Sequence, residues 1–225
     1  MKDTERPAAR IDVTRDGPYA VSGGVPLSEQ LIVTNEQGES LEYADGKKYP
    51  AQERYTLCRC GQSGHKPFCD DAHGKVKFDG TETAGRQPYI EQAETIEGPA
   101  RSLTDAKDLC AYARFCDPQG GVWRLVGQTD KPAARRLVDH EAGHCPSGRL
   151  VAWDKKTGKP IEPQFEPSLG LIEDTAKRVS GPIWVRGGIP VISADGKACE
   201  VRNRVTLCRC GRSRNKPYCD GAHTA

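Results

Sequence analysis

The chain has 225 residues, with 33 Lys and Arg against 31 Asp and Glu and a formal net charge of +2. This balance excludes a polybasic nucleic-acid arm and an acidic tail, so overall charge indicates no partner. The 24 Gly and 16 Pro predict many turns and short elements, and ten Cys are available to hold such a fold together. They would do so as disulfides in an exported protein or as metal-bound thiolates in a reducing cytosol.

Residues 1–13 alternate charged and small side chains and lack the apolar stretch of a signal peptide. We therefore expect a cytoplasmic protein in which the Cys bind metal rather than pair as disulfides. The longest segment without a charged residue is 17–28, far short of the ~20 apolar residues of a membrane span, so we expect no contact with a membrane.

An internal repeat organises the chain. Shifted by 150 positions, residues 58–73 (CRCGQSGHKPFCDDAH) align with 208–223 (CRCGRSRNKPYCDGAH), and 11 of 16 residues are identical. Upstream, GPYAVSGGVPL from Gly17 matches GPIWVRGGIPV from Gly181 at a shift of 164. The first copy therefore carries about fourteen extra residues between the two blocks, which we expect to form a longer hairpin loop.

Each copy is predicted to be a small sheet followed by a ligand loop. The apolar pieces are short, rich in β-formers and separated by GG and GxP: 19–25 with 30–34 in the first copy, and 183–185 with 189–193 in the second.

Between the copies the pattern changes to helix signals. Ser102 or Thr104 is a candidate N-cap, and Ala106, Leu109 and Ala113 follow at helical spacing, which predicts a helix over 103–115. A second helix is expected further on. Its candidate N-cap is Asp130, with Pro132 in the first turn, an apolar edge at Leu137 and Val138, and Gly143 closing it. The Pro-rich stretch 155–168 is predicted to be a linker.

The repeated block places four metal-ligand side chains in each copy with the spacing Cys-x-Cys-x8-Cys-x3-His. They are Cys58, Cys60, Cys69 and His73, and Cys208, Cys210, Cys219 and His223. One helical turn would put Cys69 and His73 on the same face, with Asp70 as the cap of that turn. The two Cys of each Cys-x-Cys pair can reach one centre as well, because residues two apart in a strand share a face. His65 is not a candidate, because Asn215 occupies its position in the other copy.

Three interpretations of these residues compete. Recurrence together with His argues against Cys that simply fill the interior. A structural zinc site of three Cys and one His remains open, although zinc motifs usually separate their paired Cys by two to four residues. From spacing alone, zinc and an iron–sulfur cluster are about equally favoured, because both take soft thiolates.

Both copies resemble the CDGSH iron–sulfur family, the mitoNEET-like proteins. Its signature is Cys-x-Cys-x2-Ser/Thr-x3-Pro-x-Cys-Asp-Gly-Ser/Ala/Thr-His, and three non-ligand positions also match in each copy: Ser63, Pro67 and Asp70, and Ser213, Pro217 and Asp220. The resemblance implies one [2Fe-2S] cluster per copy, bound by the three Cys and the His. Lys66 and Lys216 are expected either to offset the cluster's negative charge or to be solvated loop residues.

The first copy departs from the signature at Asp71, where the second keeps Gly221. We expect cluster binding to survive, because Asp is tolerated in the first turn of a helix, but the extra charge should make the first cluster harder to reduce.

Family members characteristically form two-fold dimers of one domain. The tandem copies thus imply a pseudo-dimer within one chain, with exchanged or mutually packed strands, and a monomer.

The middle segment has three further Cys. Cys110, Cys116 and Cys145, the last followed by Pro146, resemble the divergent single-cluster ferredoxin module, which implies a [3Fe-4S] cluster on three Cys or a [4Fe-4S] cluster with a fourth ligand. His140, His144 and Cys199 are candidates for that fourth position. The alternative is a decayed ferredoxin fold with ordinary buried Cys, which an unbroken helix over 103–115 would favour by pointing Cys110 and Cys116 apart.

These observations predict an α+β protein with domains at 1–90, 97–167 and 168–225: two small β-rich CDGSH repeats around an inserted ferredoxin-like module of helices and mixed structure. No nucleophile triad, phosphate loop or paired carboxylate is visible, so we expect no catalytic residues and no enzyme. The expected function is electron transfer or cluster transfer, with a redox partner or cluster acceptor protein. The alternatives are a zinc-stapled interaction module and an auxiliary subunit of a redox enzyme.

Overall fold

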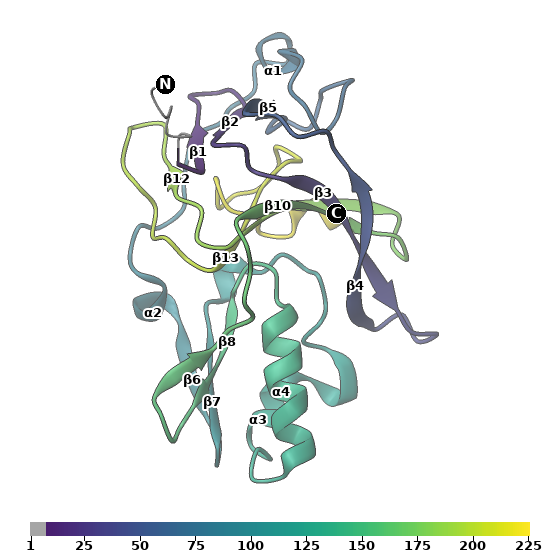
Figure 1. Cartoon of the computed structure of the whole chain (residues 1–225), viewed down its shortest axis with the longest axis vertical. Helices are drawn as coiled ribbons and strands as arrows, with labels where there is room; N and C mark the ends of the chain where they lie inside the picture. The colour runs from purple at the N-terminus through teal and green to yellow at the C-terminus, as the bar shows by residue number, and fades with distance from the viewer. Residues whose placement is uncertain (1–7) are drawn as a thin grey trace, which may run out of the picture.

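The structure is a computed structural model that describes residues 8–225 (Figure 1). Residues 1–7, the first part of the segment examined for a signal peptide, lie outside the described residues. Within 8–225, no helix has both the length and the apolar character that crossing a membrane requires.

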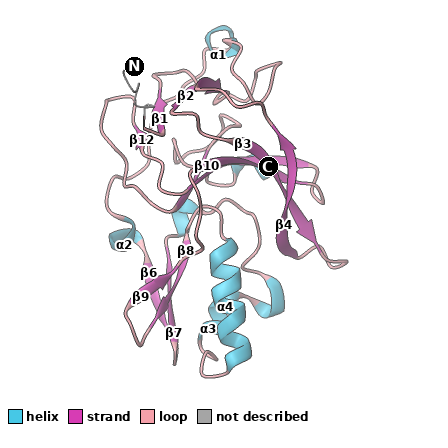
Figure 2. Ribbon diagram, viewed as in Figure 1, coloured by secondary structure: helices cyan, strands magenta, loops and turns pink. Residues whose placement is uncertain are grey.

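Three sheets and few helices make up the fold, which agrees with the predicted α+β class (Figure 2). The first sheet has the strand order β12-β1-β2-β5: Val191–Ile192, Arg10–Val13, Tyr19–Ser22 and Arg54–Leu57. The second has the order β13-β11-β10-β3-β4: Arg204–Leu207, Val179–Arg186, Ser168–Asp174, Leu27–Thr34 and Ser40–Lys48. The third has the order β6-β7-β8-β9: Glu94–Glu97, Arg101–Asp105, Leu150–Asp154 and Lys159–Ile161.

Strands of both repeats pair within the first two sheets. Strand β1 runs parallel to β12 of the second repeat, with Ile11 opposite Val191, and β10 runs parallel to β3 of the first, with Leu169 opposite Leu27. The inner pairs correspond as well, since β2 is antiparallel to β5 and β11 to β13. Apolar residues of both repeats then fill one core, so neither repeat buries its apolar face alone.

The predicted pairing of 19–25 with 30–34 is wrong, because β2 and β3 belong to different sheets. The same holds for 183–185 and 189–193, which fall in β11 and β12. In both copies a Gly pair with positive φ, such as Gly187 at 74° and Gly188 at 71°, redirects the chain into the other sheet. The expected hairpin of the first copy is confirmed, since β3 and β4 pair antiparallel there.

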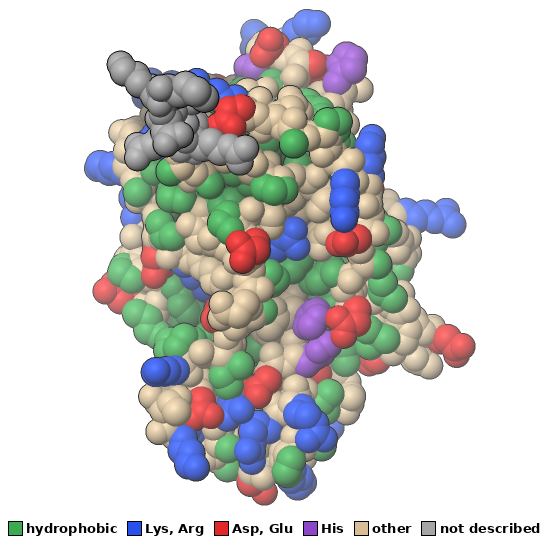
Figure 3. All heavy atoms as spheres, in the orientation of Figure 1, with side chains coloured by type: hydrophobic (Ala, Val, Ile, Leu, Met, Phe, Trp, Pro, Cys, Tyr) green, Lys and Arg blue, Asp and Glu red, His purple; other side chains and the backbone are tan. Residues whose placement is uncertain are grey.

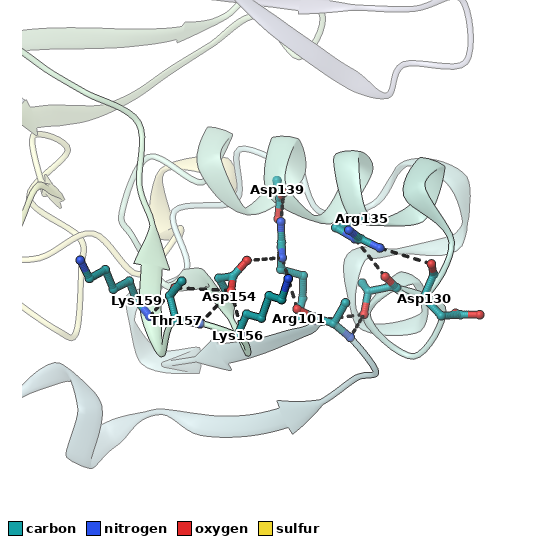
Figure 4. A network of polar contacts seen from close by, with 10 residues as sticks. Arg101, Asp130, Arg135, Asp139, Asp154, Lys156, Thr157 and Lys159 are labelled. Carbon is teal, nitrogen blue, oxygen red and sulfur yellow. Dashed lines mark hydrogen bonds and ion pairs between the residues drawn. The ribbon is translucent and has the colours of Figure 1, made fainter.

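The third sheet carries the middle segment, with α3 (Val122–Val126) and α4 (Pro132–His144) packed against it (Figure 1). Their apolar faces share a core with the sheet, including Leu103, Val138 and Leu150. On the polar side, Arg101 of β7 donates to Asp139 of α4 at 2.8 and 2.9 Å and to Asp154 of β8 at 2.8 Å (Figure 4). One guanidinium thus fastens the helix to two strands.

The predicted helix over 103–115 is wrong. Strand β7 occupies its start, a single 3₁₀ turn (η1, Lys107–Leu109) follows, and an irregular loop continues to Phe115. Tyr112 and Arg114 have φ of 55° and 63°, values that a right-handed helix cannot contain. The apolar residues of 103–115 therefore lie in a strand, a 3₁₀ turn and a loop instead of on one face of a helix.

The second helix exists as α4, but it begins at Pro132 behind Lys131, not behind Asp130, and runs through Gly143 to His144. The predicted linker at 155–168 is partly wrong, since it contains β9, which pairs with β8. Two short helices, α1 (Ala72–Lys75) and α2 (Tyr89–Gln92), and two further 3₁₀ turns, η2 (Pro118–Gly120) and η3 (Ala222–Thr224), complete the described structure.

Candidate metal centres

The Cys-x-Cys pair of each repeat follows directly on a strand of the shared core. Cys58 and Cys60 come after β5, and their sulfur atoms lie 3.7 Å apart. Cys208 and Cys210 come after β13 with the same separation of 3.7 Å. Each pair therefore presents two thiols to one point, as the sequence predicted.

The Cys-x3-His pair is equally close. Cys69 Sγ lies 3.5 Å from His73 Nδ1, and Cys219 Sγ lies 3.4 Å from His223 Nδ1. The predicted helical turn is not what joins them, because α1 begins only at Ala72. Instead the Asp70 carboxylate accepts hydrogen bonds from Ala72 N at 3.1 Å and Gly64 N at 2.8 Å, which lower its pKa.

Asp220 makes the same two contacts in the second repeat, with Ala222 N at 3.0 Å and Arg214 N at 2.8 Å. The aspartate of the signature thus ties the ligand loop to the turn that carries the His. The predicted capping is only partly correct, because the N-cap positions are Asp71 and Gly221, while Asp70 and Asp220 accept the first amide of each turn from one residue earlier.

An antiparallel bridge between Leu57 and Phe68 brings the two pairs of each site together. Cys58 N donates to Pro67 O at 2.8 Å, and Cys69 N donates to Thr56 O at 3.0 Å. The bridge between Leu207 and Tyr218 repeats this in the second copy. The four ligand candidates of each repeat therefore meet at the end of one strand pair.

Ser63 and Ser213 close the loops. The Ser63 hydroxyl donates to Phe68 O at 2.7 Å and accepts a hydrogen bond from His65 N at 3.0 Å. The Ser213 hydroxyl makes the equivalent bonds with Tyr218 O and Asn215 N at the same distances. Lys216 Nζ donates to Ser213 O at 2.8 Å, whereas Lys66 is exposed. His65 is exposed too, with 83% of its side chain accessible, as the repeat comparison predicted.

These donors fit tetrahedral metal coordination. Metal–sulfur bonds of about 2.3 Å and metal–nitrogen bonds of about 2.0 Å separate two sulfurs by about 3.8 Å and a sulfur from a nitrogen by about 3.5 Å. The four pairs have separations of 3.7, 3.7, 3.5 and 3.4 Å. Each repeat thus offers two pairs, and each pair suits one metal ion.

The two sites differ in their surroundings. Asp71 is exposed and adopts a φ of 63°, whereas Gly221 is buried with a φ of 85°. A Cβ at Gly221 would lie 2.0 Å from the ring of Tyr112, which belongs to the middle segment. Burial raises the pKa of Cys219 to about 12 and lowers that of His223. The middle segment thus covers the second site at Gly221, whereas the first site is exposed at Asp71.

The three Cys of the middle segment line one small cavity, together with Phe115 and Arg149. Burial raises the pKa of Cys116, to which the charges of Asp117 and Cys145 also contribute. Because no helix spans 103–115, the premise that pointed Cys110 and Cys116 apart is wrong. Arg149 is held at the cavity by Asp105, through contacts of 2.5 and 2.8 Å.

None of the three candidates for a fourth ligand lines this cavity. His140 and His144 contact Glu42 on the far side of α4, and Cys199 lies beside Ser193 in another hollow. In the described residues, the ionisable groups that line this cavity are the three thiols, the guanidinium groups of Arg114 and Arg149, and the phenol of Tyr112.

The cavity and the second site are neighbours. Tyr112 lines the cavity and its ring covers Gly221, while Asn215 Nδ2 donates to Asp108 O at 2.8 Å. Cys110 is close enough to Cys219 for its charge to raise the pKa of that thiol.

Comparison with known proteins agrees with this arrangement. Residues 16–74 and 180–224 match the family described as iron-binding zinc finger CDGSH type. The two repeats belong to the CDGSH family. Residues 96–155 match the family described as divergent 4Fe-4S mono-cluster, so the tandem CDGSH domains enclose a module of a second iron–sulfur family. The chain is thus an iron–sulfur protein. No curated protein and no solved structure matched the chain.

Some contacts of the CDGSH sites were missed from the sequence. Gly61 and Gly211 have φ of 76° and 77°, and a Cβ on either would lie within 2.6 Å of the Cys carbonyl oxygen of the other repeat. Both Gly recur in the aligned blocks, which was a usable signal. Tyr19 donates to Cys208 O at 2.8 Å, and Ile183 stands at its position in the second copy, so no repeat signal could have identified it.

Proposed function

We propose that this tandem CDGSH protein transfers electrons, with one [2Fe-2S] cluster in each repeat and a third cluster on Cys110, Cys116 and Cys145. When bound, such clusters accept and donate single electrons at potentials set by their ligands and surroundings. The observation that carries the proposal is the contact of Tyr112 with Gly221, which joins the middle cavity to the second repeat.

The arrangement of the donors supports two irons per repeat over one zinc ion. A single tetrahedral ion would draw all four donors within about 3.8 Å of one another. Among residues 8–225, the groups whose ligand atoms all lie within 4.8 Å of one another include no three of the four donors of either repeat. Two close pairs held apart suit a binuclear cluster.

The strand exchange supports a pseudo-dimer within one chain. Each of the first two sheets combines strands of both repeats, and Gly61 and Gly211 pack reciprocally against the other repeat's Cys carbonyl. One chain thus supplies both halves of the two-fold arrangement, and we propose that it acts as a monomer.

The exposed first site provides the exchange point with a partner. Cys69 is half-buried and Asp71 is exposed, whereas their counterparts Cys219 and Gly221 are buried. A redox partner can approach the first site closely, while the middle segment covers the second. The same exposure favours cluster transfer as a second candidate function, limited to the first repeat. We propose no catalytic reaction for the chain itself.

Pulsed EPR of the reduced protein tests the proposed route. In a Cys69→Ser variant the second repeat is the CDGSH site that remains, and in Cys219→Ser the first remains. We expect the middle cluster to shorten the spin relaxation of the second site more than that of the first. Removing it by Cys116→Ser should abolish the difference. Equal relaxation of the two sites, or no response to Cys116→Ser, would overturn the proposal.

A further inference from the structure

Two His on α4 have no part in the cysteine cavity. His140 and His144 are four residues apart, so their rings share one face of the helix, and the ring centroids lie 4.0 Å apart. That face meets Glu42 of β4, in the hairpin that the first repeat has and the second lacks. Figure 3 shows His side chains beside an acidic one in the hollow between α4 and this hairpin.

The three side chains converge on one point. His144 Nε2 lies 2.9 Å from Glu42 Oε2, and His140 Nε2 lies 3.8 Å from Glu42 Oε1. The three ligand atoms all fall within 4.8 Å of one another. Two ligand atoms on a tetrahedral ion with bonds of about 2.0 Å are about 3.3 Å apart, so small side-chain adjustments suffice.

The hydrogen bonding of His144 leaves its second ring nitrogen aimed at Glu42 and available to a metal ion. Its Nδ1 lies 2.8 Å from His140 O, a carbonyl that can only accept, so Nδ1 carries a proton. In neutral imidazole the other nitrogen, Nε2, then has a lone pair directed at the Glu42 carboxylate. Two acceptors at that distance need a proton or a metal ion between them. A backbone carbonyl that fixes the free ring nitrogen is also the usual support of a metal-bound His.

We propose that Glu42, His140 and His144 form a binding site for a divalent ion of the zinc class, separate from the cysteine centres. Two imidazoles and one carboxylate are ligands that Zn²⁺ accepts, and three protein ligands leave a fourth position open. His140 binds through Nε2, which exchanges its contact with Leu41 O for the metal while the ring proton moves to Nδ1. The open position faces a hollow of about 400 Å³, which all three ligands line.

The site gives the extra hairpin of the first repeat a role. Glu42 lies on β4 and both His lie on α4, so a bound ion joins the hairpin to the middle module. The ion would add to existing contacts between these elements, in which Tyr43 donates to His144 O at 3.3 Å and His140 Nε2 lies 3.1 Å from Leu41 O. Metal binding is therefore expected to order the hairpin.

The test uses the iron-loaded full-length protein, in which the clusters occupy every Cys except the lone Cys199, dialysed against buffered micromolar Zn²⁺. Wild type should retain one zinc per chain in addition to its iron. Glu42→Gln and His144→Ala should each weaken zinc binding at least tenfold, while His65→Ala, an exposed His elsewhere, should not. Unchanged zinc content in Glu42→Gln and His144→Ala, or no zinc in wild type, would overturn the proposal.

Hydrogen exchange provides a second measurement that a zinc-filled cysteine site would not reproduce. Zn²⁺ should slow amide exchange in β4 of wild type and leave it unchanged in Glu42→Gln. Because Glu42 is 60% exposed, the Gln variant should fold normally, and its iron content checks this. Slower exchange of β4 in both proteins would contradict the assignment of the ligands.

Discussion

At the residue scale, position 71 and its counterpart 221 distinguish the two CDGSH sites. Both backbones have positive φ, 63° at Asp71 and 85° at Gly221, which explains why the family signature has Gly there. Asp is one of the few other residues that tolerate this conformation. The first repeat can therefore carry Asp71, whereas the Tyr112 ring leaves no room for a side chain at Gly221.

Gly221→Asp, which copies the first repeat into the second, should therefore be destabilising. The positive φ costs about 1 kcal/mol for a residue with a Cβ, and displacement of the Tyr112 ring adds to this. We expect thermal unfolding to shift down and the second repeat to lose iron.

The matched variant Asp71→Gly should leave stability and iron content unchanged or slightly improved. Adding Tyr112→Gly to Gly221→Asp should recover part of the loss. If Gly221→Asp and Asp71→Gly changed the unfolding temperature equally, the Tyr112 contact would be unimportant.

The charge of Asp71 should also set the potential of the first cluster. Its amide lies 3.4 Å from Cys69 Sγ, and its carboxylate oxygen lies 3.9 Å from the same sulfur. A negative charge so near disfavours the added electron. Asp71→Asn keeps the backbone preference and removes the charge, so spectroelectrochemical titration should give a higher potential for the first site alone. A shift in the second site, or none in the first, would be inconsistent with this explanation.

At the scale of elements, α4 carries a buried carboxylate that no hydrogen bond compensates. Glu141 is 2% exposed, and neither side-chain oxygen has a partner in the described structure. Burial, with smaller contributions from Asp117 and Glu39, raises its pKa to about 8 from the ordinary 4.5. The folded chain thus retains a proton that the unfolded chain releases, and its stability falls as pH rises between these two values.

Glu141→Gln should remove this pH dependence. The variant's advantage in free energy of unfolding over wild type should grow by about 3 kcal/mol between pH 6 and pH 9. Denaturant unfolding at both pH values measures it. Parallel pH profiles for wild type and variant would mean that Glu141 is ionised in the folded protein.

At the scale of the whole molecule, the sequence predicted the repeat and its ligands better than the pairing of the strands. The aligned blocks identified both Cys-x-Cys pairs, because a ligand set depends on short spacings that survive duplication. The resemblance implied exchanged or mutually packed strands, but it did not indicate which strands pair, since β1 of one repeat pairs with β12 of the other over a separation that no local pattern records.

The middle module shows the same limit. Ala106, Leu109 and Ala113 have helical spacing, yet pairing of β7 with β8 and positive φ at Tyr112 and Arg114 overrode it. The loop that results places Tyr112 against Gly221 and brings the three thiols to one cavity. Neither contact could be predicted from residues so far apart in the chain. The domain limits at 1–90, 97–167 and 168–225 stay predictions.

The most direct test of the central claim is the iron, zinc and acid-labile sulfide content of freshly purified protein, together with its visible spectrum. Two [2Fe-2S] clusters and a third cluster on the middle thiols predict about seven or eight iron and about eight sulfide per chain. Cys116→Ser should reduce both to about four. About four of each in wild type would remove the third cluster, and about two zinc with no sulfide and no colour would contradict the iron–sulfur account of both repeats.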